Sequence, residues 1–458
     1  MQTQTPQPTI VDIADVVETQ EKAWFPVSVF LMCCLIMVVD GFTQQSLNYV
    51  APAIIADWGI GRATMAAVFD INIVGWMLGS IGLSMLGDRI GRRPSILLAL
   101  LTLGIFTISL AAATNLVELS VLRFFAALGT GGSMPMAVAL VADYAPTRTR
   151  GFKITLLYLG YTIGSSGGGF LAAVLTPAFG WRSVFVVGGA TSLAVGAVLA
   201  IVLPESVRYL ALKQQSHDRA LAYARRLKPS AAFDLTTRFV VKETEKSGVL
   251  LRHLFTEGRS AMTTLLWLAT GLGNITHFFL STWLTTLLSE YSKQMTIPMA
   301  QMTSALFQLG AAFGWCVGWL LDKRGISAVA MVIVAGAFPV VGLGLVRAAP
   351  PSTMALALTS GILVLGGGIG LTAASSMMYP TFIRSTGTGA AFAAARTGAL
   401  LGPAIAGYLV YLQAPLPFIF LVGALPMVAA GAITFMLGRA MTPAAVREMA
   451  STSAFARH

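Results

Sequence analysis

Charged residues are scarce in this chain of 458 residues. Asp, Glu, Lys and Arg together make up 11% of it, whereas a soluble domain carries about 25% charged residues. Hydrophobic residues make up 56%. This balance excludes an ordinary soluble domain and predicts an integral membrane protein.

Cysteine and histidine are also scarce, with three Cys and four His. Cys33, Cys34 and Cys316 all fall within apolar stretches, which argues against a disulfide framework and against a metal site. The sequence contains neither a phosphate-binding loop nor a recognisable pairing of a nucleophile with a base. We therefore expect no enzyme activity, no metal and no cofactor.

Long apolar runs are abundant instead. Twelve runs reach the length of roughly 20 residues that a helix needs to span a bilayer. They are too long and too continuous for barrel strands, and the 46 glycines suit close packing between helices. The predicted fold is an all-α membrane protein with twelve transmembrane helices, near residues 26–50, 64–86, 96–114, 117–143, 153–177, 182–203, 261–288, 299–321, 327–347, 353–379, 389–412 and 416–438.

The net charge of +11 is explained by topology. With both termini in the cytoplasm, 24 of the 30 Lys and Arg residues lie on the cytoplasmic side, four lie in outward loops and two lie inside helices. This bias follows the positive-inside rule, so no nucleic-acid partner is expected. Residues 1–23 lack a signal peptide. They are predicted to be a short polar cytoplasmic tail with a helical turn near 11–18. The protein is predicted to be a monomer and to lie in the inner membrane.

The two halves of the chain repeat at an offset of 234 residues. This offset pairs Asp88 with Asp322, Gly91 with Gly325, Pro146 with Pro380, Arg150 with Arg384 and Gly164 with Gly398. Parallel repeats of this kind enclose a site near the midplane and rock around it. The predicted segments are an N-terminal tail (1–23), a six-helix bundle (24–203), a central cytoplasmic loop (204–260), a second six-helix bundle (261–438) and a C-terminal tail (439–458).

Two short loops carry a charged motif, "GDRIGRRPS" from residue 87 and its copy "LDKRGIS" from residue 321. The pair resembles the loop motif of the major facilitator superfamily, and the cytoplasmic acid and base Asp143 and Arg150 resemble another of its motifs. A turn of this kind lets two helices meet closely and places its acid near a helix N-terminus or a basic partner. We predict gating roles, with a plain charged turn as the alternative, for Asp88, Arg92, Asp143, Arg150, Asp322 and Arg384.

The first helix carries an unexpected acid in "IMVVDGFTQQSLNYV" (36–50). A carboxylate at the centre of a bilayer helix costs about 2.5–3.5 kcal/mol, so Asp40 is predicted to bind and release protons. The alternative is a structural hydrogen bond between helices. Gln44 and Asn48 share a face with Asp40 and are predicted to line the same cavity, unless they too join helices.

Two further charges lie inside the apolar runs. Asp70 and Arg123 each lie about 9 Å from the predicted outer end of their helix, at 1.5 Å per residue. We predict an ion pair between them that contributes to proton coupling. Solvation of Asp70 near the interface, and a snorkelling Arg123, are the alternatives.

Several stretches together resemble the aromatic acid:proton symporter family over about residues 25–440. They are "DGFTQQSLNYVAPAI", "GDRIGRRP", "MPMAVALVADYAPTRTRG", "FGWRSVFVVGG", "LPESVRYL", "FFLSTWLTTLL" and "YPTFIRSTGTGAAFAAARTGALLGPAIAG". The resemblance implies proton-driven uptake of a small organic anion such as a hydroxybenzoate, with Asp40 in proton coupling. Thr43 stands where the family commonly has a second acid, so Asp70 is predicted to take over part of that work.

Arg396 is the predicted clamp for the substrate carboxylate, because a guanidinium binds a carboxylate through two parallel hydrogen bonds. A structural pairing of Arg396 is the alternative. Candidate contacts for an aromatic ring, which simple packing would also explain, are Tyr158, Tyr161, His277, Phe278 and Trp283. A proton-coupled antiporter for drugs is the second function, but the fifth span "LGYTIGSSGGGF" lacks the Gly-Pro pair that those families carry.

Overall fold

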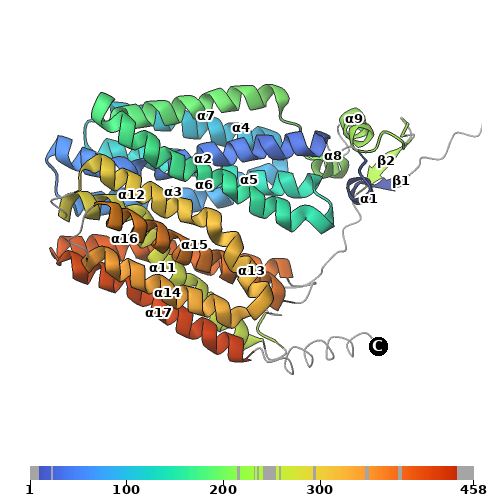
Figure 1. Cartoon of the computed structure of the whole chain (residues 1–458). Coiled ribbons are helices and arrows are strands. Elements are labelled where there is room, and N and C mark those ends of the chain that lie inside the picture. Colours follow the sequence, from blue (N-terminus) through green and yellow to red (C-terminus); the bar gives the residue numbers. More distant parts are fainter. Residues whose placement is uncertain are drawn as a thin grey trace, which may run out of the picture. The chain divides into compact units, whose positions relative to one another are not determined.

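Helices form nearly all the regular structure in the computed structural model of the chain (Figure 1). The structure describes residues 10–21, 24–213, 217–231, 233–234, 237–240, 254–256, 259–291, 295–345, 350–379 and 384–440. The long helices of the first half are α2 (Trp24–Trp58), α3 (Thr64–Ile90), α4 (Arg92–Ser109), α5 (Leu116–Tyr144), α6 (Thr147–Phe179) and α7 (Arg182–Val202). Those of the second half are α11 (Ser260–Tyr291), α12 (Ile297–Leu309), α13 (Gly314–Arg324), α14 (Ile326–Leu345), α15 (Pro350–Met378), α16 (Arg384–Tyr411) and α17 (Leu416–Ala440).

The twelve predicted spans correspond to these helices. Among the described residues, nine helices are long and apolar enough to cross a membrane. The eighth span is broken, because the 3₁₀ turn η2 (Gly310–Phe313) separates α12 from α13. Most helices extend beyond the apolar run that predicted them, since polar residues at their ends continue the same backbone hydrogen bonding outside the hydrocarbon layer.

Glycines at equivalent positions confirm the internal repeat. Gly91 and Gly325 follow the corresponding helices with φ of +108° and +73°, a backbone conformation that favours glycine. Gly164 of α6 lies against the carbonyl of Val38 in α2, and Gly398 of α16 lies against that of Gly271 in α11. The same helix pairs therefore cross at glycine in both halves of the sequence.

The helices pack into two compact units. Unit 1 consists of Met1–Ser46, Ile71–Gly168 and Arg182–Lys246, and unit 2 of Leu47–Asp70, Gly169–Trp181 and Ser247–His458. Packing thus divides the chain differently from the repeat, because parts of α2, α3 and α6 belong to the unit of the later helices. The predicted six-helix bundles 24–203 and 261–438, which follow the sequence repeat, stay a prediction.

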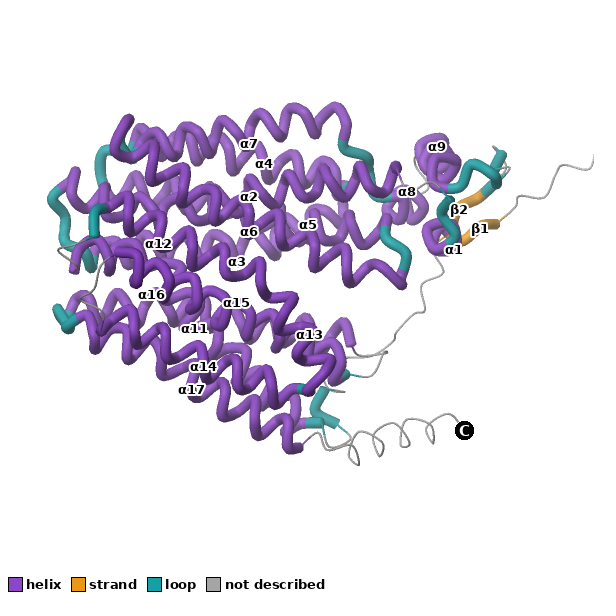
Figure 2. Tube along the Cα trace, viewed as in Figure 1, coloured by secondary structure: helices purple, strands orange, loops and turns teal. Residues whose placement is uncertain are grey.

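A small layer in unit 1 joins the N-terminal tail to the central loop. Strand β1 (Ile10–Asp12) pairs in parallel with β2 (Arg238–Val240), so that Ile10 lies opposite Arg238. Beside them lie α1 (Ile13–Glu18), α8 (Val207–Lys213) and α9 (His217–Leu227), as Figure 2 shows.

Helix α1 forms because its N-cap and its apolar spacing agree. The Asp12 side chain accepts a hydrogen bond of 2.9 Å from the backbone amide of Ala14, which caps the helix. Ile13, Val16 and Val17 are buried, and their spacing places them on one face. The predicted helical turn near 11–18 is confirmed, and this part of the tail is a packed element.

Candidate functional site

Asp40 lies on α2 in unit 1 with only 1% of its surface exposed. Ser133 of α5 donates a hydrogen bond of 2.5 Å to its Oδ1 atom. Its Oδ2 atom has no hydrogen-bond partner, and no ion pair among the described residues includes Asp40. The hydrogen bond between helices that was the alternative prediction is therefore present, but it involves only one of the two carboxyl oxygens.

Arg123 of α5 is also 1% exposed and holds α2 immediately after Asp40. Its guanidinium donates to the backbone carbonyls of Thr43, at 3.1 Å, and Gln44, at 2.7 Å. The snorkelling alternative is wrong, since the side chain is enclosed by the protein. Asp70 belongs to unit 2, so its ion pair with Arg123 stays a prediction.

The side chain of Thr43 forms its hydrogen bonds within α2. Its hydroxyl donates to the carbonyl of Val39 at 2.8 Å, within its own helix. Arg123 meets the backbone oxygen of this residue rather than its side chain. Within unit 1 the guanidinium therefore binds main-chain carbonyls, and the hydroxyl of Thr43 takes no part in holding it.

Helix α6 passes directly beside Asp40. A Cβ atom added to Gly41 would meet the backbone of Tyr161 and would lie 2.9 Å from the amide nitrogen of Ser165. Tyr158 and Tyr161 are half-buried on this helix. Gln44 is half-buried with its Oε1 atom enclosed and without a hydrogen bond. Contact of Tyr158, Tyr161 and Gln44 with a substrate stays a prediction.

The predicted substrate residues of the second half lie on α11 and α16 in unit 2. The rings of His277 and Phe278 are half-buried with centroids 4.7 Å apart, and Arg396 is half-buried two residues before Gly398. Trp283 is fully buried and donates to the carbonyl of Pro403 at 3.1 Å. Trp283 therefore packs within the unit, while Arg396 and the two rings retain exposed surface.

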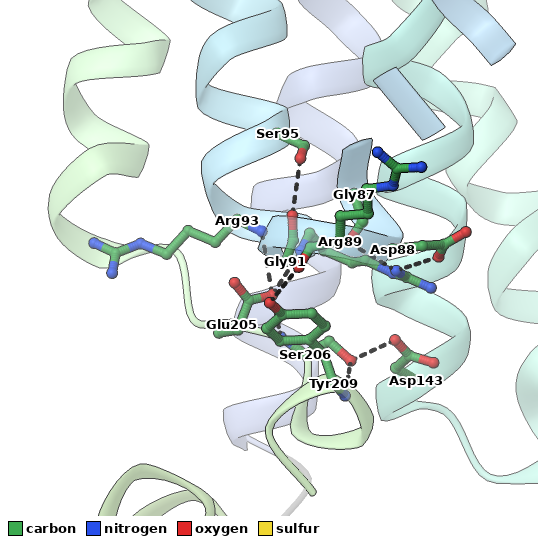
Figure 3. Close-up of polar contacts among 11 residues, drawn as sticks. Gly87, Asp88, Arg89, Gly91, Arg93, Ser95, Asp143, Glu205, Ser206 and Tyr209 are labelled. Atoms are coloured by element: carbon green, nitrogen blue, oxygen red, sulfur yellow. Dashed lines mark hydrogen bonds and ion pairs between the residues drawn. The ribbon is translucent and has the colours of Figure 1, made fainter. Parts of the chain in front are cut away.

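A network of polar side chains lies in unit 1 at the loop between α3 and α4 (Figure 3). Arg92 Nη1 donates to Asp88 Oδ1 at 2.6 Å, which gives Asp88 the predicted basic partner. Asp143 Oδ2 accepts from Ser206 at 2.6 Å, while Arg150 donates to the carbonyl of Ala145. The acid and the base of this motif thus form hydrogen bonds to different groups, and the hydroxyl beside the acid comes from the segment after α7.

Glu205 is the centre of this network. Its Oε1 atom accepts from the backbone amides of Arg92 at 2.8 Å, Arg93 at 3.2 Å and Ser206 at 2.8 Å. A carboxylate is favoured at this position because the N-terminus of α4 carries a partial positive charge. Tyr209, one turn further on, donates its hydroxyl to the carbonyl of Arg89 at 3.0 Å.

The side chains of Asp322 and Arg384 lie outside the described residues, and their gating roles stay predictions.

Comparison with known proteins decides the family. The model of the Major Facilitator Superfamily matches residues 33–383. The chain belongs to this superfamily. The gallate transporter of Pseudomonas putida is 33% identical over 433 residues, which cover 94% of this transporter and 96% of the relative. The 4-hydroxybenzoate transporter PcaK of the same species is 32% identical over 400 residues, which cover 86% of this chain and 88% of PcaK.

Solved structures support the same fold. A bacterial homolog of the human lysosomal transporter Spinster matches with a TM-score of 0.71 over 92% of this transporter and 98% of that chain, at 16% identity. The nucleoside transporter NupG matches with a TM-score of 0.66 at 12% identity. The predicted twelve-helix fold and the resemblance to aromatic acid transporters are both confirmed.

Sequence analysis missed Glu205 as a functional residue of this transporter. The stretch "LPESVRYL" was visible, but it served only to support a resemblance. The acid directly after Pro204, at the end of a predicted span, was the only local signal. Which helix it caps depends on the packing of α7 against α4, which no local pattern reveals.

Proposed function

We propose that this transporter takes up an aromatic carboxylate, such as a hydroxybenzoate-like acid, together with protons by alternating access. The aromatic substrate class rests on the relatives, whose names specify gallate and 4-hydroxybenzoate. Proton coupling rests on one observation in unit 1. The carboxyl group of Asp40 is almost completely buried, and one of its oxygens has no hydrogen-bond partner.

The surroundings of Asp40 favour its neutral form. A buried carboxylate is costly unless it is paired and fully hydrogen-bonded. Asp40 accepts one hydrogen bond from Ser133, while the hydrogen bonds of Arg123 go to the backbone carbonyls of Thr43 and Gln44. A bound proton removes this penalty, so a carrier that protonates Asp40 changes conformation more readily.

Arg396 is the proposed partner of the substrate carboxylate. A guanidinium offers a planar fork that matches a carboxylate, and a bound anion neutralises its charge. Accumulating one anion against a negative-inside potential of 100 mV costs about 2.3 kcal/mol. One proton carried with each anion cancels this electrical cost and lets the proton gradient drive uptake.

We place the transporter in the inner membrane with both termini in the cytoplasm. The distribution of Lys and Arg supports this orientation. Impermeant labelling of single cysteines introduced at residues 62 and 219 of intact cells tests it. Labelling at 62 alone is expected, and labelling at 219 alone would reverse the topology.

The function is tested in proteoliposomes with a panel of labelled aromatic acids and an imposed pH gradient. An acidic exterior is expected to stimulate uptake of at least one acid. In Asp40→Asn this stimulation is lost, while exchange of labelled for unlabelled substrate is retained. Asp218→Asn, at an exposed acid of α9, is the matched control and behaves as the wild type.

Two results would contradict the proposal. Uptake by Asp40→Asn that still responds to the pH gradient would exclude Asp40 from proton coupling. Extrusion of an organic cation driven by inward proton flow, with no uptake of any acid, would establish the antiporter instead.

A further inference from the structure

Unit 2 contains a second polar cluster, at the end of α11 that the predicted topology places outside. Arg62 lies in the connection between α2 and α3, and its Nε atom is 3.0 Å from Glu290 Oε2 at the end of α11. The same guanidinium lies over the ring of Tyr291, 4.9 Å from its centroid. One arginine thus binds a carboxylate and an aromatic ring on adjacent residues of α11.

Gln301 of α12 makes a second connection to the early helices. Its side chain is completely buried, and its Nε2 atom donates to the carbonyl of Tyr49 on α2 at 3.0 Å. The same nitrogen lies 3.1 Å from the hydroxyl of Thr176 on α6. A single amide group therefore joins three helices.

Small residues allow these helices to approach one another. A Cβ atom added to Gly407 of α16 would lie 2.6 Å from the Cβ of Ala66 on α3. One added to Gly169 of α6 would lie 2.6 Å from the Cβ of Ala305 on α12. Both distances are shorter than packed carbon atoms tolerate, so this end of unit 2 is closed by direct contact.

All these contacts join segments of the first sequence repeat to helices of the second. We propose that Arg62, Glu290 and Gln301 form an outer latch, which holds this end closed and must open before substrate enters from outside. The inference rests on the proposed alternating-access transport, in which the two repeats move against each other. It adds a gate on the side opposite to the predicted cytoplasmic gating residues.

The chemistry of the latch suits repeated opening. The side chains of Arg62 and Glu290 are 40% and 21% exposed, so water reaches both charges as soon as they separate. Exposed pairs of this kind contribute little to stability, and water replaces the hydrogen bonds of a released amide. The latch therefore stabilises the closed arrangement only weakly, so that it can open in every transport cycle.

The first experiment measures opening without any substrate. Phe69, which is 1% exposed and packs against Trp283 at 5.4 Å, is replaced by Cys after the three native cysteines are changed to Ala. Glu290→Gln is expected to raise the rate of labelling at position 69 by an impermeant thiol reagent about 1.5- to 5-fold. The swap Arg62→Glu with Glu290→Arg restores the slow rate, and Glu118→Gln, at an exposed acid of α5, leaves it unchanged.

The second experiment closes the latch covalently. Arg62→Cys and Glu290→Cys are bridged by a short bifunctional thiol reagent that a reductant cleaves. Uptake is expected to stop after bridging and to return after reduction. Equal labelling rates in wild type and Glu290→Gln, or full uptake by the bridged protein, would overturn the latch. Labelling that responds as predicted in a protein that carries no aromatic acid would refute the proposed substrate but leave the latch standing.

Discussion

Replacement of Glu205 distinguishes two ways in which a carboxylate can stabilise the polar network at the loop between α3 and α4. Glu205 is 8% exposed, and its Oε1 atom accepts hydrogen bonds from three backbone amides. Glu205→Gln keeps an oxygen acceptor and removes the charge beside the N-terminus of α4. Glu205→Ala removes the acceptor as well and leaves the three amides without their partner.

The two substitutions should differ clearly in size. Loss of the charge alone costs about 0.3–1 kcal/mol, the usual interaction of an anion with a helix N-terminus. Loss of the acceptor adds about 1–3 kcal/mol for each buried amide that water cannot reach. We therefore expect Glu205→Ala to lower the free energy of unfolding by at least about 2 kcal/mol more than Glu205→Gln.

Unfolding of the purified transporter in detergent, followed by circular dichroism, measures both effects. Glu118→Ala provides the control, because Glu118 also accepts a backbone amide, that of Thr114 at 2.9 Å, but in an exposed position. Its effect should be smaller than that of Glu205→Ala. If Glu205→Gln and Glu205→Ala were equally destabilised, the hydrogen bonds to α4 would not be what holds the network.

Three further predictions follow from close contacts in unit 1. Gly164→Ala should abolish folded protein, judged by size-exclusion chromatography, because its Cβ would overlap the backbone of Val38; Gly167→Ala in the same helix has open space and should be tolerated. Arg123→Lys should cost about 1–3 kcal/mol of unfolding free energy, because an ammonium cannot reproduce the two directed hydrogen bonds to adjacent carbonyls; unchanged stability would contradict this. Val16→Asp should detach α1, which is measured as faster protease cleavage of the tail, whereas Asp15→Asn at the same helix should leave cleavage unchanged.

The spans were predictable because they depend on local composition. A run of apolar residues identifies a membrane helix wherever its neighbours lie, and the polar positions within it, such as Asp40, mark the side that avoids lipid. The repeat at 234 residues was equally visible, because equivalent turns require equivalent residues such as Gly91 and Gly325.

Partners were harder to predict, because they depend on the register between helices. Arg123 donates hydrogen bonds to the backbone carbonyls of Thr43 and Gln44, and main-chain partners of this kind leave no trace in a sequence. Asp143 accepts a hydrogen bond from Ser206, which lies 63 residues away in the sequence, so no local pattern identifies this partner. The interruption between α12 and α13 was also missed, since its residues "GAAF" are compatible with a continuous helix.

The parallel pairing of Ile10–Asp12 with Arg238–Val240 makes the N-terminal tail part of the fold of unit 1. Backbone hydrogen bonds between the two strands hold a segment of the N-terminal tail to a segment of the central loop, although the two lie far apart in the sequence. Trimming the first dozen residues, as is common when expression vectors are prepared, would remove β1 and leave the backbone groups of Arg238–Val240 without their partner strand.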